Sequence, residues 1–258
     1  METGSNERTR RVAPVLLAAG GGTRWDGAGH KLAAPLEGTP VIEHAMRAAV
    51  ESGLGTVIVV TGATTVHLPD DLAGRIELVD NPDWAEGQST SLLRAVASAS
   101  ERLEQPRHLR HPHGCFQIHR EHLREHRLER GRHRLRGGDV HVFSAQRQRL
   151  HHRLDERHRA HERGADAVVV GLGDQPRISP DAWRAVAASS SSLAVAVYGE
   201  SRGHPVLIGR DHWNDLPNSG DLGARELLRR FDEQVEAIPC EGSALDVDTT
   251  EDLNQWQS

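Results

Sequence analysis

The chain of 258 residues is poor in several kinds of residue, and each scarcity narrows what it can be. Aromatic residues make up only 3%, so the core must be built from aliphatic side chains. The cysteines, Cys115 and Cys240, form no paired motif, which favours a reducing compartment. No apolar run approaches the roughly 18 residues of a membrane span, and the charged N-terminus lacks the apolar stretch of a signal peptide. We therefore expect a cytoplasmic protein without a membrane partner.

Lysine is the scarcest basic residue, because Lys31 is the only one in the chain. It follows an apolar run, 12–18, that leads into three glycines, Gly20–Gly22, and Arg24. A buried strand that runs into glycines exposes backbone N–H groups, which bind phosphate. The loop lacks both GxxxxGK[ST] and GxGxxG, the two common phosphate motifs. It is therefore either a less common triphosphate-binding loop or an ordinary glycine turn.

Strands and helices alternate along most of the chain. The continuous β-branched run at 56–61 is typical of a strand buried on both faces. The alternation predicts a mostly parallel sheet covered by helices on both faces, with ligands at the carboxyl ends of its strands. We expect strands at 12–18, 56–61, 75–79, 167–172, 193–198, 205–208 and 235–238, and helices at 39–49, 87–99, 179–188, 223–231 and 249–256. Thr39-Pro40 and Ser179-Pro180 predict the starts of two of these helices, with Thr39 and Ser179 as the N-caps.

Acidic residues stand at two places beside the expected elements. Asp174 follows the strand 167–172, and Asp246 and Asp248 precede the last helix. Carboxylates from separate elements beside a basic loop suit magnesium-assisted phosphoryl or nucleotidyl transfer, in which the loop's cations neutralise the leaving pyrophosphate. Each acid alone is equally typical of a turn, and Asp248 or Thr249 could simply cap the last helix. The combination favours a metal-dependent site.

Residues 101–163 differ in composition from the rest of the chain. They hold 16 arginines, 12 of the 17 histidines, 9 acidic residues and only 15 apolar residues. Such a segment cannot bury enough apolar surface to offset the entropy that ordering would cost. We expect a low-complexity insertion, disordered or loosely helical, within one domain formed by 12–100 and 164–258, after a flexible tail at 1–11.

Three other interpretations of this insertion stay open. His122 and His126 match the HxxEH spacing of zinc proteases, with His119 near the same helical face, but a segment so rich in histidine produces this pattern by chance. The arginines could bind a polyanion, although isolated aromatic residues do not favour base stacking, so no nucleic-acid partner is expected. The composition is also what a GC-rich gene yields when read in a shifted frame.

Five motifs, in order, resemble those of the MobA-like NTP transferases, in their molybdenum cofactor cytidylyltransferase branch. Leu17 to Gly20, with Arg24 and Lys31, is similar to the signature LAAGxSxRMGxxK. Trp25-Asp26 stands where the signature has Met-Gly, and the lysine comes two residues later than in the signature. The four later motifs are at 173–176, 202–207, 220–225 and 246–249.

The resemblance implies a Rossmann-like three-layer α/β/α sandwich with a mostly parallel sheet, of the nucleotide-diphospho-sugar transferase type. It implies transfer of CMP from CTP to molybdopterin with Mg²⁺ and release of pyrophosphate, and a molybdoenzyme or chaperone as a candidate partner. LAAG favours cytidine, because the guanosine branch usually reads LAGG. The alternatives are another NTP or phosphorylated acceptor, or a catalytically impaired homologue whose insertion binds a polyanion or a metal.

The resemblance also implies roles for individual residues of this chain. Catalysis is expected from Lys31, Arg24 and Asp174. Magnesium is expected at Asp174, with Asp248 or Asp246 as the second carboxylate. The nucleotide is expected at Leu17, Ala18, Ala19, Gly20, Gly21, Gly22, Gly87, Gln88 and Ser89, and the acceptor at Gly203, His204 and Pro205.

Overall fold

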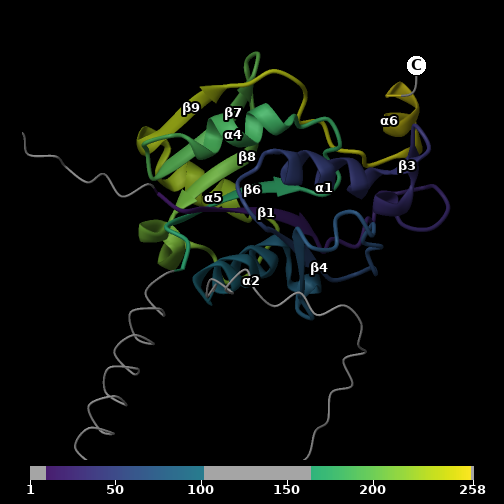
Figure 1. Ribbon diagram of the computed structural model, residues 1–258, viewed down its shortest axis with the longest axis horizontal. Helices are drawn as coiled ribbons and strands as arrows, with labels where there is room; N and C mark the ends of the chain where they lie inside the picture. The colour runs from purple at the N-terminus through teal and green to yellow at the C-terminus, as the bar shows by residue number, and fades with distance from the viewer. Residues whose placement is uncertain (1–9, 102–163, 257–258) are drawn as a thin grey trace, which may run out of the picture. The chain divides into compact units, whose positions relative to one another are not determined.

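The computed structural model describes residues 10–101 and 164–256 (Figure 1). All of the expected insertion except Glu101, and all of the expected tail except Arg10 and Arg11, lie outside these residues. The interpretations offered for the insertion, including the histidine spacing of a zinc site, therefore lie outside them as well.

A seven-stranded sheet with the order β5-β4-β1-β6-β8-β7-β9 forms the centre of the described part. Its neighbouring strands pair in parallel except at β8, which is antiparallel to both β6 and β7. The chain leaves β1 for β4 and β5 on one side and then returns to β6 on the other, so the order reverses between β1 and β6. The strands are β1 (Val12–Ala18), β4 (Val57–Thr61), β5 (Ile76–Asp80), β6 (Ala167–Leu172), β7 (Leu193–Tyr198), β8 (Ser201–Gly209) and β9 (Val235–Pro239).

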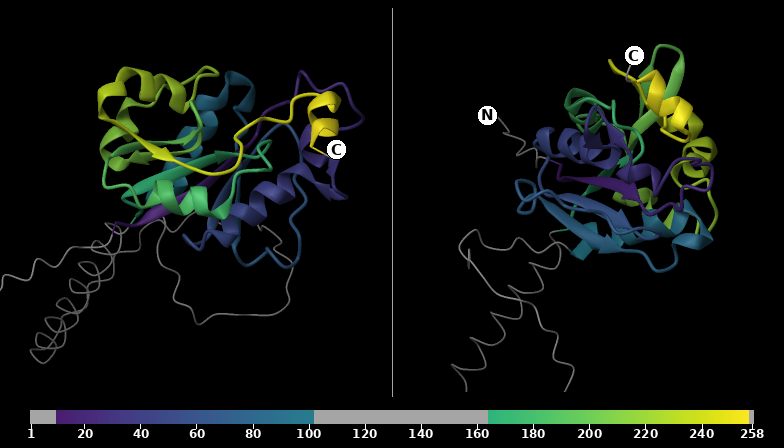
Figure 2. Two further views of the ribbon diagram at one scale, coloured as in Figure 1. Left: turned by 90° about the horizontal axis from the view of Figure 1, so that it is seen from above. Right: turned by 90° about the vertical axis from the view of Figure 1, so that its right-hand side faces the viewer.

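Helices cover both faces of the sheet, which gives the predicted three-layer α/β/α sandwich (Figures 1 and 2). Residues of α1 and α4 pack into one apolar cluster on one face, and residues of α2 and α5 pack into a second cluster on the other. None of the helices described here has the length and apolar character that a membrane crossing requires. The helices are α1 (Val41–Glu51), α2 (Gln88–Glu101), α4 (Pro180–Ala187), α5 (Ala224–Arg230) and α6 (Thr250–Gln255), with short 3-10 turns η1 (Lys31–Ala33), η2 (Trp84–Glu86), η3 (Arg210–Asp215) and η4 (Asp232–Gln234).

The core is aliphatic, as the composition predicts, with one large exception. Successive residues of β1 alternate between the two clusters, so Val15 packs on the α2 side and Leu16 on the α1 side. Trp183 of α4 is almost fully buried on the α1 side. A Cβ atom at Gly171 would lie 2.5 Å from Cζ2 of Trp183, so the strand needs glycine where the indole crosses it.

The first helix begins later than the sequence predicts. Thr39 and Pro40 form β3 (Thr39–Pro40), which pairs with β2 (Pro35–Leu36), and α1 begins only at Val41. Pro40 is the N-cap with an extended backbone, and no side chain caps the helix, so the predicted cap at Thr39 is wrong. The predicted cap of α4 is confirmed, because the hydroxyl of Ser179 accepts a hydrogen bond from the backbone N–H of Ala182 at 3.2 Å.

Candidate functional site

The carboxyl ends of β1 and β6 meet where the strand order reverses, the usual ligand position in an open α/β sheet. The loop that contains Gly20–Gly22, called the glycine loop below, follows β1, and Gly173 and Asp174 follow β6. Gly173 donates its N–H to the carbonyl of Leu17 at 2.8 Å, and a Cβ atom at Gly173 would lie 3.1 Å from Cβ of Ala18. Glycine therefore allows the two strand ends to approach closely and brings Asp174 beside the loop.

Lys31 lies between two of the expected carboxylates. Its Nζ is 2.6 Å from Oδ2 of Asp174 and 2.9 Å from Oδ1 of Asp248. The side chains are mostly shielded from water, with exposed fractions of 11% for Lys31, 20% for Asp174 and 16% for Asp248. Burial alone would lower the pKa of Lys31, but the charges and hydrogen bonds of the two carboxylates outweigh it and raise the pKa. The only lysine of the chain is therefore held as a cation in this cluster.

The other expected charged groups gather around the same cluster. A guanidinium nitrogen of Arg24 lies 2.8 Å from Oδ2 of Asp248, while 73% of the arginine side chain is exposed. The amide of Gln175 donates to Oδ1 of Asp246 at 2.8 Å. The pKa of Asp246 is raised because its carboxyl group is partly shielded from water and faces the negative charge of Asp174. Direct ion pairs thus join Arg24, Lys31 and two carboxylates, and Asp246 adds a third negative group nearby.

The backbone of the segment around Asp248 is fixed on both sides. Val247 donates its N–H to the carbonyl of Asp174 at 2.8 Å, and the Val247 side chain is fully buried. Thr249 forms a capping box with Asp252 at the start of α6, so Thr249 is the cap and Asp248 is left free to face Lys31. This geometry resolves the choice between Asp248 and Thr249 that the sequence leaves open.

The glycine loop is folded back by a histidine. Nε2 of His30 lies 3.0 Å from the carbonyl oxygen of Gly20, and Nδ1 accepts the N–H of Leu32 at 3.3 Å. With Nδ1 as the acceptor, the proton must be on Nε2, which donates to the carbonyl. The ring therefore joins the start of the loop to the 3-10 turn that carries Lys31.

An indole ring lies against the glycine loop. A Cβ atom at Gly21 would be 3.1 Å from Cζ3 of Trp84, and one at Gly62 would be 2.7 Å from the tryptophan Cβ. The side chain is partly exposed, with 36% of the residue accessible. Trp84 opens η2, which leads directly to Gly87, so the loop after β5 is packed against the loop after β1.

The expected nucleotide residues after η2 pack against the loop before α5. Gly87 has a φ of +109°, and a Cβ atom there would lie 2.4 Å from the backbone of Gly220. The N–H of Ser89 donates to the carbonyl of Gly220 at 3.0 Å, and a Cβ atom at Gly223 would touch the amide of Gln88. Their contact with a nucleotide stays a prediction, since their contacts here are with this loop.

The expected acceptor residues lie at the start of β8. Because β8 is antiparallel to β6 and Val206 pairs with Val170, the residues that precede Val206 on β8 extend toward the carboxyl end of β6, where Asp174 follows. A Cβ atom at Gly203 would lie 2.6 Å from Cβ of Ala244, so this strand touches the segment that carries Asp246. Burial, and then the charge of Arg225, lowers the pKa of His204 to about 4, which keeps its ring neutral near pH 7. Pro205 follows as a buried residue.

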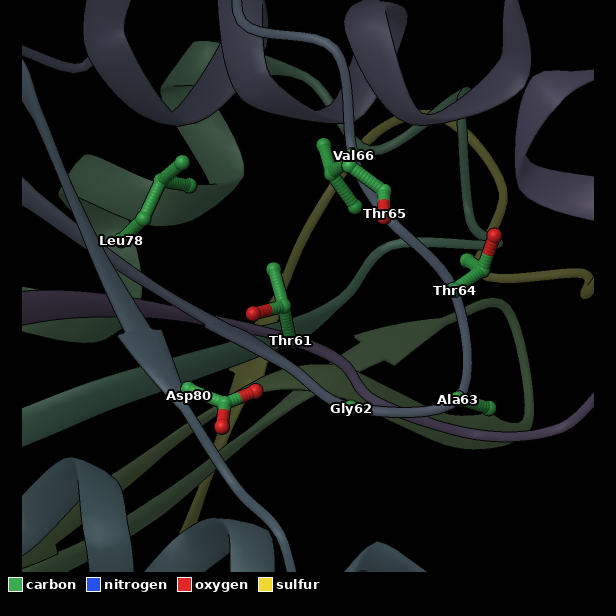
Figure 3. Close-up of a pocket in the computed structure, with 8 residues that line it drawn as sticks. All are labelled: Thr61, Gly62, Ala63, Thr64, Thr65, Val66, Leu78 and Asp80. Atoms are coloured by element: carbon green, nitrogen blue, oxygen red, sulfur yellow. The ribbon is translucent and has the colours of Figure 1, made fainter.

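A pocket of about 240 Å³ opens at the carboxyl ends of β4 and β5 (Figure 3). Thr61 and Asp80 end the two strands, and Leu78 and Val66 provide apolar surface on either side of the opening. The pocket adjoins the glycine loop, since Ala63 donates its N–H to the carbonyl of Ala19 at 3.0 Å. The sequence pattern did not identify this hollow, which is lined by Thr61, Gly62, Ala63, Thr64, Thr65, Val66, Leu78 and Asp80.

The family model for the MobA-like NTP transferase domain matches residues 14–236. This range includes the glycine loop, Lys31, Asp174 and β8. The chain belongs to the MobA-like NTP transferase family. A search of curated proteins found no match to the chain. Membership confirms the predicted enzyme class, a nucleotidyltransferase.

Several solved structures have a similar fold. Rv0371c from Mycobacterium tuberculosis H37Rv has 20% identity, covers 97% of this chain and 99% of its own, and has a TM-score of 0.60. A nucleotidyl transferase from Methanothermobacter thermautotroptrophicus has 21% identity, covers 96% of both chains, and has a TM-score of 0.62. A manganese complex of Rv0371C has 20% identity, covers 96% and 98%, and has a TM-score of 0.56. At these identities the likeness shows the fold.

The donor set of this MobA-like transferase fits a hard divalent cation. Oxygens of Asp174 and Asp248 converge on one point, the Lys31 ammonium, and Oε1 of Gln175 is buried without a hydrogen-bond partner in the described part. No three His, Cys, Asp or Glu residues within 10–101 and 164–256 form a complete ligand cluster. Magnesium commonly takes one or two carboxylates and completes its shell with water and substrate phosphates, so the residues present fit it.

Sequence reasoning assigned no role to three members of the site, His30, Trp84 and Gln175, although Gln175 belongs to the motif at 173–176. His30 and Gln175 are immediate neighbours of Lys31 and Asp174, and adjacency to a functional residue was the available signal. Trp84 is one of only five tryptophans, and it follows the Asp-Asn-Pro turn. Their contacts depend on where separate loops meet, which residue spacing does not reveal.

Proposed function

We propose that this protein transfers CMP from CTP to a phosphorylated molybdopterin-type acceptor and releases pyrophosphate. The observation that carries the proposal is the convergence of Lys31, Arg24, Asp174 and Asp248 beside the glycine loop. Family membership supports the reaction class. The sequence LAAG at the start of the loop supports cytidine as the base.

In this reaction a phosphate oxygen of the acceptor forms a bond to the α-phosphorus of CTP. The bond from that phosphorus to the oxygen bridging to the β-phosphate breaks, and pyrophosphate leaves. Lys31 and the exposed Arg24 neutralise the charge that develops on the leaving group. The pKa of Lys31 is raised, because the two carboxylates outweigh its burial, so it stays charged through the working pH range.

Asp174 and Asp248 would hold the Mg²⁺ ion, whose chemistry is to polarise the phosphate oxygens of CTP. Their carboxylates come from the end of β6 and from the segment before α6, so two independent parts of the fold supply them. Asp246, which accepts a hydrogen bond from Gln175, is the alternative second carboxylate for the metal ion. Burial and the charge of Asp174 raise the pKa of Asp246, so its ionised form is less favoured than that of an exposed aspartate. We therefore place Asp248 before Asp246 as the second carboxylate.

We assign the acceptor to the side of Asp174 away from the glycine loop. The strand order β1-β6-β8 supports this assignment, since the strand that leads to Asp174 lies between the strand that leads to the glycine loop and the strand that carries Gly203 to Pro205. Nucleotide and acceptor would then meet beside the carboxylate, which transfer between them requires. The neutral ring of His204 offers hydrogen bonding on the acceptor side without repelling or attracting its phosphate.

The proposal is tested by measuring pyrophosphate release with molybdopterin, Mg²⁺ or Mn²⁺, and each NTP in turn. CTP should support release, and Lys31→Ala should lower the rate by orders of magnitude. Arg47→Met, which removes a cation from an exposed ion pair with Glu43 and Asp71, is the matched control and should leave the rate unchanged. Release with GTP but not CTP overturns the cytidine assignment, and no release with any NTP from folded protein overturns the proposed reaction.

A further inference from the structure

The loop that carries Arg24 also makes contacts with the C-terminal helix. Asp26 stands where the signature has glycine, and its Oδ1 accepts the backbone N–H of Thr250 at 3.0 Å. Hydrogen bonds from Thr250 lower the pKa of Asp26, so the carboxylate is charged at neutral pH. Thr250 is the first residue of α6 and lies only two positions after Asp248. The carboxylate thus supports a helix N-terminus directly beside a site residue.

Trp25 also joins the loop that carries Arg24 to the segment around α6, through apolar contacts. Its side chain packs against a small cluster to which Val247 and Leu253 belong, one on each side of Asp248. A Cβ atom at Gly27 would lie 2.5 Å from Cζ2 of Trp25 and 2.9 Å from Cγ2 of Thr250. The missing side chain at Gly27 is therefore what allows the indole and α6 to meet.

Helix α6 in turn fixes the backbone of Asp248. Oδ2 of Asp252 accepts the N–H of Asp248 at 3.0 Å and the N–H of Thr249 at 2.8 Å. Because this carboxylate belongs to the first turn of α6, any shift of the helix displaces Asp248 with it. The Arg24–Asp248 ion pair closes the connection back to the loop.

We infer that Trp25 and Asp26 are positioning residues that hold α6 against the loop and thereby place the Asp248 carboxylate between Arg24 and Lys31. Neither residue touches the reacting atoms. The part that Asp248 plays toward a metal rests on the proposed function, whereas the tether between loop and helix does not. A Met-Gly pair could not reproduce it, since glycine has no side chain to accept the Thr250 N–H.

The variants Asp26→Ala and Asp26→Asn separate the tether from general effects on folding. The asparagine oxygen can still accept the Thr250 N–H, and alanine cannot. Hydrogen–deuterium exchange should become faster in 246–256 for Asp26→Ala and stay near the wild-type rate for Asp26→Asn. The dissociation constant for Mn²⁺ should rise by about threefold to fivefold in the alanine variant alone.

Trp25→Ala, compared with Trp25→Phe, should reproduce both effects, and Asp71→Ala provides a matched control. Asp71 is likewise an exposed carboxylate with a lowered pKa, which follows from its hydrogen bond to Arg47 on α1, so its loss should change neither readout. If Trp25→Ala fails to fold, Asp26→Ala decides alone.

Unchanged exchange in 246–256 for Asp26→Ala overturns the tether. Faster exchange with an unchanged Mn²⁺ constant, or with no Mn²⁺ binding by the wild type, overturns the positioning role. Faster exchange in a protein whose wild type releases no pyrophosphate with any NTP overturns the proposed function and leaves the tether standing.

Discussion

Replacing Lys31 by methionine removes the cation of the central cluster and keeps most of the side-chain volume. The ammonium lies 2.6 Å from Asp174 and 2.9 Å from Asp248, and its loss leaves two largely shielded carboxylates without it. Breaking a buried pair by removing one partner destabilises a protein by about 3–5 kcal/mol. Because both carboxylates keep some exposure and Arg24 still pairs with Asp248, we expect a loss of about 2 kcal/mol in the free energy of unfolding at pH 8.

The contribution of Lys31 to stability should be the same at pH 5 and at pH 8. In the wild type, burial lowers the pKa of Lys31, but Asp174 and Asp248 outweigh it and raise the pKa above 10.5. A raised pKa contributes stability that is fully present below 10.5 and is lost only as the pH rises through the folded-state value. The lysine contribution is therefore constant between pH 5 and 8.

The assay is urea unfolding of the two proteins at pH 5 and pH 8. Arg47→Met is the matched control, because Arg47 also bridges two carboxylates, Glu43 and Asp71, but its own side chain is 39% exposed, against 11% for Lys31. Its loss should be much smaller and nearly independent of pH over this range. A Lys31→Met loss no larger than that of Arg47→Met would refute the account of the cluster.

Three further predictions concern other parts of the fold. Asp174→Asn should lower the rate of pyrophosphate release by orders of magnitude with little change in the circular dichroism spectrum. Gly87→Ala should lower the melting temperature clearly, since φ is +109° and the new Cβ would lie 2.4 Å from Gly220, while Gly74→Ala, which meets nothing within 4 Å, should not. Burial lowers the pKa of His204 from 6.5 to about 4, so the unfolded chain takes up a proton first as the pH falls through this window, and the folded protein is destabilised. Relative to His204→Gln, the wild type should lose about 3 kcal/mol in the free energy of unfolding between pH 6.5 and 4, measured by urea unfolding.

Much of the fold could be predicted because the relevant patterns are local. The β-branched run that became β4 and the Ser-Pro start of α4 each determine their own element. The pairing of Thr39 with Leu36 was the exception, because a two-residue hairpin replaced the cap that Thr39-Pro40 resembles. A tertiary contact outweighed a local preference there.

The charged residues of the candidate site could be predicted from the sequence, but the contacts that hold them in position could not. Lys31, Asp174 and Asp248 converge because the ends of β1 and β6 and the segment before α6 lie at one edge of the sheet. The hydrogen bond from Thr250 to Asp26 joins residues 224 positions apart, and no periodicity encodes such a contact. The unusual Trp25-Asp26 pair was visible in the sequence, but the helix that it holds became visible only in the structure.

The central claim, cytidylyl transfer at the Lys31 cluster, is tested most directly by mass analysis of the product formed from CTP and molybdopterin with Mg²⁺. The account predicts an acceptor whose mass has increased by one CMP, formed by the wild type and by Arg47→Met but not by Lys31→Ala. An acceptor of unchanged mass in the presence of folded wild-type protein, or equal product from Lys31→Ala, would contradict it.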